Sequence, residues 1–434
     1  METSSHSTTQ AAKATNFRWL VVALAFVGMT INYIDRANIG AALPSLSGDL
    51  HLSNFQQGCV LSAFFYTYAS FQFFGGWTAD RLGPRRIFTL ASLWWGGVTA
   101  ATALATGFGS LFGLRLLLGA GEASAYPACA SAVGRWVARD ERAFATAIYD
   151  NGTRVGGALT LPLVMLLIQG FGWRQSFVIT GCLGIAFALL WVCLYRDPDK
   201  HPRVNAAELT LIHGDAPPQA SVEAEKPKIR WFSLLTFRPV WGVMLGSFSM
   251  NFIAYFFITW MPTYFAKALH FSLLKTGFTG MLPPLVAVVA GLLGGLFGDV
   301  MVKRGVALTT ARKIVIAIGM VCSSAIALSV FAPSAEWSVA LLCLSYSGVA
   351  FCASNSGSLP MDLAPDKRHV AALMGIQLGS ANLAGIVMPM VVGYFLDKEN
   401  NFSHALMLIG LFGLLGLFAF MVLLDKVEPI RFKS

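Results

Sequence analysis

A short polar stretch, Gly76-Trp77-Thr78-Ala79-Asp80-Arg81-Leu82-Gly83-Pro84-Arg85-Arg86, separates two long apolar stretches of the sequence. A shorter version occurs in the second half of the chain, where Gly295-Leu296-Phe297-Gly298-Asp299 is followed by Lys303-Arg304-Gly305. Both copies place Gly-x-x-x-Asp at the end of the second long apolar stretch of their half. There, glycine permits close helix packing, the aspartate can lie against a helix terminus, and the arginines can reach backbone carbonyls or lipid phosphates. The repetition predicts two halves of similar architecture.

Around these two stretches the chain holds twelve apolar segments, each long enough to cross a bilayer as a helix of about 20 residues. Their extents are 19–40, 55–77, 87–107, 109–134, 143–168, 175–196, 239–265, 276–299, 312–332, 337–361, 368–395 and 402–425. One long polar segment separates the sixth from the seventh. We therefore predict an all-α integral membrane protein of 12 transmembrane helices in two pseudo-symmetric six-helix bundles, 1–196 and 239–434, joined by a cytoplasmic linker, 197–238.

The amino-acid composition agrees with this prediction. Hydrophobic residues make up 56% of the 434 residues, charged residues make up 12%, and the mean hydropathy is +0.63. A soluble protein uses roughly 25% charged residues to cover its water-facing surface. The composition therefore excludes a soluble globular protein and predicts the lipid bilayer as the surrounding medium.

The positive charges are distributed unevenly along the chain. If the helices alternate in direction, 24 of the 31 Lys and Arg residues fall on one side of the membrane and four on the other. Because cytoplasmic loops carry the excess of Lys and Arg, both termini are predicted to be cytoplasmic. The net charge of +9 then reflects topology and attraction to anionic headgroups, and no nucleic-acid partner is needed to explain it.

The sequence carries no pattern typical of a metal, nucleotide or catalytic site. Its seven cysteines have no CxxC spacing, and its seven histidines fall in tails, loops or helix ends. No Gly-x-x-x-x-Gly-Lys-[Ser/Thr] occurs, so ATP is not expected to drive the protein. We expect no cofactor, and an intramembrane enzyme is disfavoured because no nucleophile with a base converges at membrane depth.

The polar stretch and the twelve-helix plan resemble the major facilitator superfamily. The inter-helix signature of that superfamily, G-x-x-x-D-R-x-G-x-[RK]-[RK], is matched by Gly76, Asp80, Arg81, Gly83, Arg85 and Arg86. A closer likeness is to its anion:cation symporter branch, with bacterial galactonate, glucarate and hexuronate carriers and sialin-like carriers. That likeness is carried by Asn32-Tyr33-Ile34-Asp35-Arg36-Ala37-Asn38, by Tyr68, and by 113–123. The resemblance implies two bundles around a midplane cavity with alternating access.

Six ionisable residues lie inside the predicted spans, all in the first half of the chain, and each costs about 2.5–3.5 kcal/mol unless it is paired or hydrated. They are Asp35, Arg36, Arg115, Glu122, Asp150 and Arg154. Three acids and three bases indicate mutual compensation around one aqueous cavity. Arg115 and Glu122 are seven residues apart and therefore share a helix face, whereas Asp35 and Arg36 are adjacent and diverge by about 100°.

We interpret the first four of these residues as a binding and proton-coupling group. The arginines can bind a substrate carboxylate bidentately, with Arg36 facing the ligand and Asp35 turned toward Arg115, while Asp35 and Glu122 carry protons. The family likeness points the same way, with Arg36 as the carboxylate clamp. The alternative is that these residues are fixed ion pairs that hold the first and fourth spans together.

Asp150 and Arg154 have the i, i+4 spacing of a local ion pair on the fifth span. If they neutralise each other, their role is structural and Asp150 carries no proton. If Arg154 instead faces the cavity, it offers a second anion contact, which favours a dicarboxylate or an acid with a second polar end. Sugar-acid relatives often have an uncharged polar residue here, so this chain departs from the family pattern.

Neutral polar residues complete the predicted site. In the second half they are Asn251, Tyr255, Ser354, Asn355, Ser356, Gln377 and Asn382, and on the second span Tyr68 matches the family position. Opposite a bound carboxylate they can serve the hydroxyl groups of a polyhydroxylated substrate. Hydrogen bonding across helices or to the backbone is the alternative for each of them.

These observations together predict a proton-coupled symporter that takes up a small organic anion, most simply a sugar acid, into a bacterial cell through the inner membrane. A carrier for an aromatic or dicarboxylic acid is the alternative, and an exporter or antiporter is less favoured because a basic cavity repels cationic drugs. The expected partners are the organic anion, protons and the lipid bilayer, and we expect the protein to function as a monomer.

Overall fold

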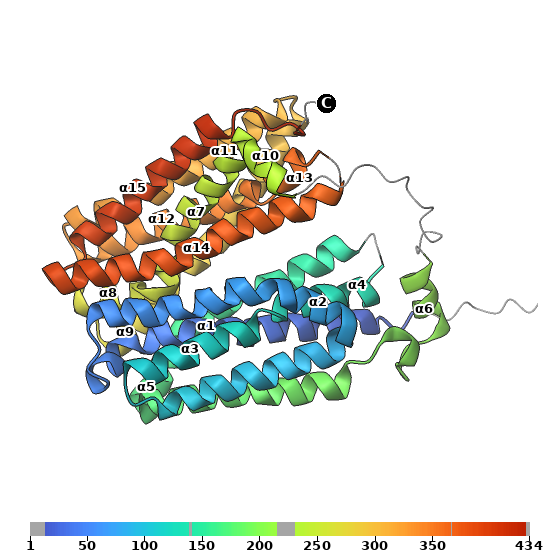
Figure 1. Ribbon diagram of the computed structural model, residues 1–434, viewed down its shortest axis with the longest axis horizontal. Helices are drawn as coiled ribbons and strands as arrows, with labels where there is room; N and C mark the ends of the chain where they lie inside the picture. Colours follow the sequence, from blue (N-terminus) through green and yellow to red (C-terminus); the bar gives the residue numbers. More distant parts are fainter. Residues whose placement is uncertain (1–13, 139–140, 215–230, 366, 431–434) are drawn as a thin grey trace, which may run out of the picture.

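The computed structural model describes residues 14–138, 141–214, 231–365 and 367–430, apart from a few side chains within helices. The described residues form helices and no strand. Figure 1 shows the helices of the first half of the chain, drawn in blue to green, packed as one group beneath those of the second half, drawn in yellow to red. The predicted all-α membrane fold is confirmed. The bundle limits 1–196 and 239–434 stay a prediction.

The first half consists of long helices. They are α1 (Phe17–Asp49), α2 (Asn54–Ala101), α3 (Phe108–Glu122), α4 (Ala125–Trp136) and α5 (Arg142–Leu194). Two of them change direction at a glycine, α2 at Gly83 (φ 76°) and α5 at Gly172 (φ 83°). Only glycine adopts such positive φ values without a steric cost, so each glycine divides one continuous helix into two crossing segments.

The second half is more interrupted. Its helices are α7 (Arg238–Thr259), α8 (Met261–Lys267), α9 (Leu273–Gly280), α10 (Leu282–Lys303), α11 (Leu308–Ser323), α12 (Ala335–Ser356), α13 (Leu359–Leu363), α14 (Lys367–Glu399) and α15 (Ser403–Phe418). Pro262, Pro283 and Pro360 stand in the first turns of α8, α10 and α13. Proline has no backbone N–H to donate and tends to start a helix, so it marks each interruption.

The twelve predicted apolar segments all coincide with helical segments of the structure. Among the described residues nine helices are long and apolar enough to cross a membrane, and residues 144–194 of α5 are one of these nine although the chain turns at Gly172. Several predicted segments differ from the expectation of one helix, since 239–265, 276–299 and 337–361 are divided between α7 and α8, α9 and α10, and α12 and α13. The fourth predicted segment, 109–134, differs in the same way. It is divided into α3 and α4, and the break follows directly after Glu122.

The two halves are joined at the end of the molecule that carries α8 and α9, which we call the α8–α9 end. The carboxylate of Asp397, near the end of α14, accepts hydrogen bonds from the backbone N–H groups of Asn54 and Phe55, both at 2.8 Å. Deeper in, Ser62 Oγ donates to the carbonyl of Ile386 at 2.6 Å. Gly58 touches the backbone at Pro389, where any Cβ would collide with the carbonyl oxygen. This end is therefore closed.

The opposite end carries α6 (Ala206–His213), which belongs to the polar segment after α5 (Figure 1). Glu208 of α6 is fully buried and accepts a hydrogen bond from the backbone N–H of Arg18 at 3.0 Å. The guanidinium of Arg18 also pairs with Glu141 at 2.8 Å. The beginning of the predicted linker is thus packed against the first half.

Candidate functional site

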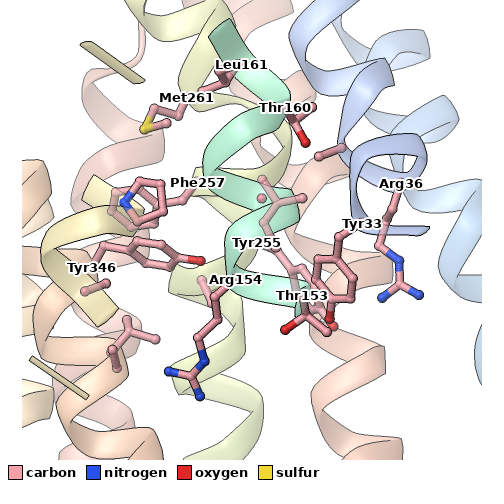
Figure 2. A pocket seen from close by; sticks show the side chains of 18 of the residues that line it. Tyr33, Arg36, Thr153, Arg154, Thr160, Leu161, Tyr255, Phe257, Met261 and Tyr346 are labelled. Carbon is pink, nitrogen blue, oxygen red and sulfur yellow. The ribbon is translucent and has the colours of Figure 1, made fainter. Parts of the chain in front are cut away.

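A cavity of about 290 Å³ lies between the two halves of the chain. Helices α1 and α5 supply one wall, and helices α7, α10 and α12 supply the other. Its polar and aromatic lining residues are Tyr33, Arg36, Phe65, Thr153, Arg154, Thr160, Asn251, Tyr255, Phe257 and Tyr346 (Figure 2). A pocket at the interface between two bundles is a common place for a ligand.

Arg36 is held by an acidic group and by aromatic rings. Its Nε and Nη2 atoms both lie 3.0 Å from Oε2 of Glu122, the last residue of α3. Its guanidinium carbon lies 4.7 Å from the ring centres of Tyr33 and Phe64 and 4.5 Å from that of Tyr68. A guanidinium placed over aromatic faces is attracted to them and is kept in one orientation. The arrangement fixes the only charged group of α1 that lines the cavity.

The Glu122 carboxylate is only partly satisfied. The residue is 1% exposed, and its second oxygen, Oε1, has no hydrogen-bond partner among the described residues. Helix α3 ends at Glu122 and α4 begins at Ala125, so the carboxylate that meets Arg36 lies at the break between the two helices. A buried carboxylate whose hydrogen-bonded cation is an arginine of the cavity wall is sensitive to anything that draws the arginine away.

The neighbouring Asp35 and Arg115 are also buried, at 1% and 4% exposure. The sequence suggested that Asp35 turns toward Arg115. In the described part of the chain, however, both carboxylate oxygens of Asp35 lack a hydrogen-bond partner, and Arg115 Nη2 instead donates to the Arg36 carbonyl at 3.5 Å. Arg115 also lies over the ring of Phe64 at 5.2 Å. The four residues therefore form one buried group behind the cavity wall, of which only Arg36 reaches the main cavity.

Arg154 also lines the cavity, from α5. The sequence left open whether it pairs with Asp150 or faces the cavity, and the structure shows both. The two charged groups are 3.9 Å apart, and their side chains are 44% and 40% exposed. This is a loose ion pair beside open space rather than a buried one.

Four aromatic residues of the cavity wall were not among the predicted site residues, namely Tyr33, Phe65, Phe257 and Tyr346. Tyr33 lies one helical turn before Arg36 and stacks on it, so the i, i+3 spacing was the signal that could have revealed it. Tyr346 of α12 and Phe257 of α7 stack face to face at 4.3 Å. A single tyrosine within an apolar helix is a weaker signal, because the sequence does not define which way it faces.

The predicted polar residues of the second half separate into two groups. Asn251 and Tyr255 line the cavity, as expected. The others, Ser354, Asn355, Ser356, Gln377 and Asn382, are not lining residues. The amide of Asn355 bonds to the Gly294 carbonyl and to Arg312, and that of Gln377 bonds to Ser247 Oγ and the Ser356 carbonyl. In this conformation these two amides are occupied by helix contacts.

Residues 25–365 of the chain match the sequence profile of the Major Facilitator Superfamily. The chain belongs to this superfamily. It is 32% identical to the probable galactarate/D-glucarate transporter GudP of Bacillus subtilis, over 99% of this chain and 96% of that protein. It is 35% identical to the probable sulfoacetate transporter SauU of Cupriavidus necator, over 88% and 87%, and 33% identical to a D-galactonate transporter of Escherichia coli, over 97% and 98%.

Solved structures agree on the fold. A bacterial homologue of the human lysosomal transporter Spinster, in an inward-facing and occupied conformation, superimposes with a TM-score of 0.77 over 95% of this chain and 97% of that one, at 18% identity. The Major Facilitator Superfamily consists of transporters, so this chain is a multi-pass membrane transporter and not an enzyme. The resemblance to sugar-acid carriers expected from the sequence is confirmed.

The superfamily's loop signature lies at the turn within α2. Gly83 provides the positive φ of that turn, and the guanidinium of Arg135 lies beside it. Arg85 donates to the Val192 carbonyl at 2.7 Å, so one signature arginine does reach a backbone carbonyl, while Arg86 is exposed. The exposed Arg81 has a partner as well. The surroundings of Gly76 and the side chain of Asp80 lie outside the described part of the structure.

Proposed function

We propose that this transporter is a proton-coupled symporter that takes up a small organic anion, most simply a sugar acid. The observation that supports this proposal most directly is the ion pair between Arg36, on the cavity wall, and Glu122, a carboxylate buried behind it. An anion in the cavity and the Glu122 carboxylate would compete for the same guanidinium. A proton is then the simplest compensation for a buried acid that loses its cation.

The proposed cycle follows from that competition. When the substrate carboxylate engages Arg36, Glu122 loses its partner and takes up a proton, and Asp35, buried next to Arg36 without a hydrogen bond in the described structure, can do the same. After release of substrate and proton, Glu122 returns to Arg36. Substrate and proton therefore travel together, because Arg36 and Glu122 are both free of an unpaired charge only in the doubly loaded and the empty site.

The comparisons support an organic anion as the cargo, because relatives of nearly full length are named galactarate/D-glucarate, sulfoacetate and D-galactonate transporters. The bundles 1–196 and 239–434 would rock about the cavity while the linker 197–238 joins them, as alternating access requires. The uneven distribution of Lys and Arg supports cytoplasmic termini, in a bacterial inner membrane, with the α8–α9 end outside.

The test is uptake of labelled galactarate, galactonate, glucuronate and an aromatic acid into proteoliposomes, with and without an inwardly directed proton gradient. We expect the gradient to drive accumulation of at least one sugar acid, and Arg36→Ala to abolish it. Glu122→Gln should keep exchange between substrate pools on the two sides but lose accumulation above equilibrium. Normal uphill uptake by Glu122→Gln, or uptake of equal size with and without the gradient, would contradict the proposal.

A further inference from the structure

The cavity contains two positive charges and no negative charge among its lining residues. Of the described residues that line it, Arg36 and Arg154 alone are ionisable to a full charge at neutral pH. Arg36 comes from α1 and Arg154 from α5, and in Figure 2 Tyr33 and Thr153 are seen between them. A ligand that entered this space would therefore meet two cations, both carried by helices of the first half.

The guanidinium of Arg154 extends away from its own helix toward the opposite half. An added Cβ at Gly291 of α10 would lie 3.3 Å from Arg154 Nη1, so the side chain reaches this helix of the second half. Its acidic partner Asp150 is 3.9 Å away, beyond hydrogen-bond distance, and both side chains are more than one-third exposed. Arg154 consequently keeps donors that can turn to a ligand.

Neutral hydrogen-bonding groups belong to the same lining as the two arginines. Thr153, Tyr255 and Tyr346 line the same cavity and offer hydroxyl groups, and Asn251 offers an amide. The volume of about 290 Å³ is close to the lower end of the range of ~300–1,000 Å³ that is typical of small-molecule pockets, so the occupant is a small molecule.

From this arrangement we infer that the substrate is a dianion, a short polar chain with an acidic group at each end, and that Arg154 is the specificity-determining residue for the second acidic group. This inference rests on the proposed function, in which Arg36 takes the first acidic group. A monoanion would leave the charge of Arg154 balanced by a loosely placed aspartate alone. A diacid would neutralise both arginines, and its hydroxyl groups could form hydrogen bonds with the neutral polar residues of the same lining.

Galactarate and galactonate make a matched pair of probes. Both have six carbons and the same hydroxyl pattern, and they differ at one end, where galactarate has a carboxylate and galactonate a CH₂OH group. We would measure equilibrium binding of each acid to the purified protein and its uptake into proteoliposomes. The unmodified protein should bind galactarate at least ~10-fold more tightly than galactonate, a ratio that corresponds to about 1.4 kcal/mol.

The decisive variant is Arg154→Gln. It should weaken galactarate binding at least ~10-fold and change galactonate binding less than ~2-fold, so that the preference disappears. Arg154→Lys should restore part of the preference, because the charge is kept while the fork is lost. Asp150→Asn should leave galactarate binding unchanged or tighter. Arg174→Gln, which removes an exposed arginine paired with Asp49 at the α8–α9 end, is the matched control and should change neither affinity.

The outcomes separate this inference from the proposed function. If Arg154→Gln lowers both affinities by the same factor, or neither, or if the unmodified protein prefers galactonate, the dianion inference is overturned while the symporter proposal stands. If the unmodified protein takes up no acid of the panel and Arg36→Ala changes nothing, both are overturned. Size-exclusion profiles of the variants show whether a loss of binding arises from misfolding. If Arg154→Gln misfolds, the affinities of Arg154→Lys for galactarate and galactonate decide between the outcomes.

Discussion

At the scale of single residues, Arg36 carries more of the proposed mechanism than any other group. Two kinds of contact fix it, charge-assisted hydrogen bonds to Glu122 and the faces of Tyr33, Phe64 and Tyr68. Each cation–π contact is worth about 0.5–2 kcal/mol, depending on how dry the site is. The rings remain in place when the carboxylate is exchanged for a substrate, so the guanidinium stays oriented throughout.

Replacing Arg36 by lysine tests whether the planar fork matters or only its charge. We expect Arg36→Lys to weaken binding of the transported acid at least ~10-fold, about 1.4 kcal/mol, because an ammonium group cannot form two parallel hydrogen bonds or stack on three rings. The measurement is calorimetric titration of the purified variant. Arg135→Lys, at an exposed pair with Asp197, is the control and should have little effect. An unchanged affinity in Arg36→Lys would show that the guanidinium geometry is unimportant.

At the scale of elements, the closure of the α8–α9 end depends on a carboxylate from one half that caps a helix of the other. Asp397 of α14 accepts from the first two N–H groups of α2, which a helix cannot satisfy internally. Such a cap is worth about 0.5–2 kcal/mol, and the helix dipole adds to it. Lys267 also donates to the side chain of Asn54 at 3.0 Å. These contacts form and break as a unit when this end opens.

Removal of the cap should therefore change the balance between conformations. We expect Asp397→Ala to shift the population toward the form open at the α8–α9 end by roughly 2- to 30-fold, the range that corresponds to about 0.5–2 kcal/mol. Distances between spin labels near the start of α2 and the end of α14 measure the shift. Glu399→Gln is a suitable control, since Glu399 pairs with His404 inside the second half. Equal distance distributions in all three proteins would argue against a role for the cap.

At the scale of the whole molecule, the two halves need a connection that tolerates their movement. The first described part of the linker, 197–214, is attached to the first half, through Glu208 and through His201, whose ring lies 4.0 Å from Phe17 and 5.6 Å from Trp136. Burial against these rings lowers the pKa of His201, and the nearby Arg196 and Arg203 lower it further, against the opposing effects of a hydrogen bond with the Leu194 backbone and of Glu208. Burial would raise the pKa of Glu208, but hydrogen bonds from Arg18 and Thr15 outweigh it and hold that pKa below its usual range.

The signs of these shifts predict a pH dependence of the attachment. Protonation of His201 is disfavoured when the segment is attached, so attachment is complete above the usual pKa of 6.5 and weakens as the pH falls below it. The contribution of Glu208 is complete above 4.5 and declines only in stronger acid. The protection of residues 196–213 against hydrogen exchange, taken relative to the intrinsic exchange rate at each pH, should therefore be lower at about pH 5.5 than at about pH 7.5, and His201→Phe should remove the difference. The same pH response in His201→Phe would exclude this residue as its cause.

Much of the site could be located from the sequence, because a charge within an apolar helix is conspicuous. Arg36 was expected at a cavity and lines it, Arg154 lines it as one of the two alternatives left open for it, and Asp35, Arg115 and Glu122 lie directly behind. The direction of neutral polar groups could not be predicted in the same way. Gln377 was expected to face the substrate, yet it bonds to Ser247, whereas Tyr346 was not singled out and lines the wall.

The amino-acid sequence by itself determined the membrane, the helical segments and the half of the chain in which the charges lie, since each follows from the cost of placing polar groups in lipid. The tertiary structure alone decided which face each helix turns inward, that α3 ends at Glu122, and that Arg154 reaches across to α10. The physical reason is that a helix apolar on all sides has no amphipathic stripe to define its rotation. Neighbouring residues are about 100° apart, so packing between helices selects the side chains that meet in the cavity.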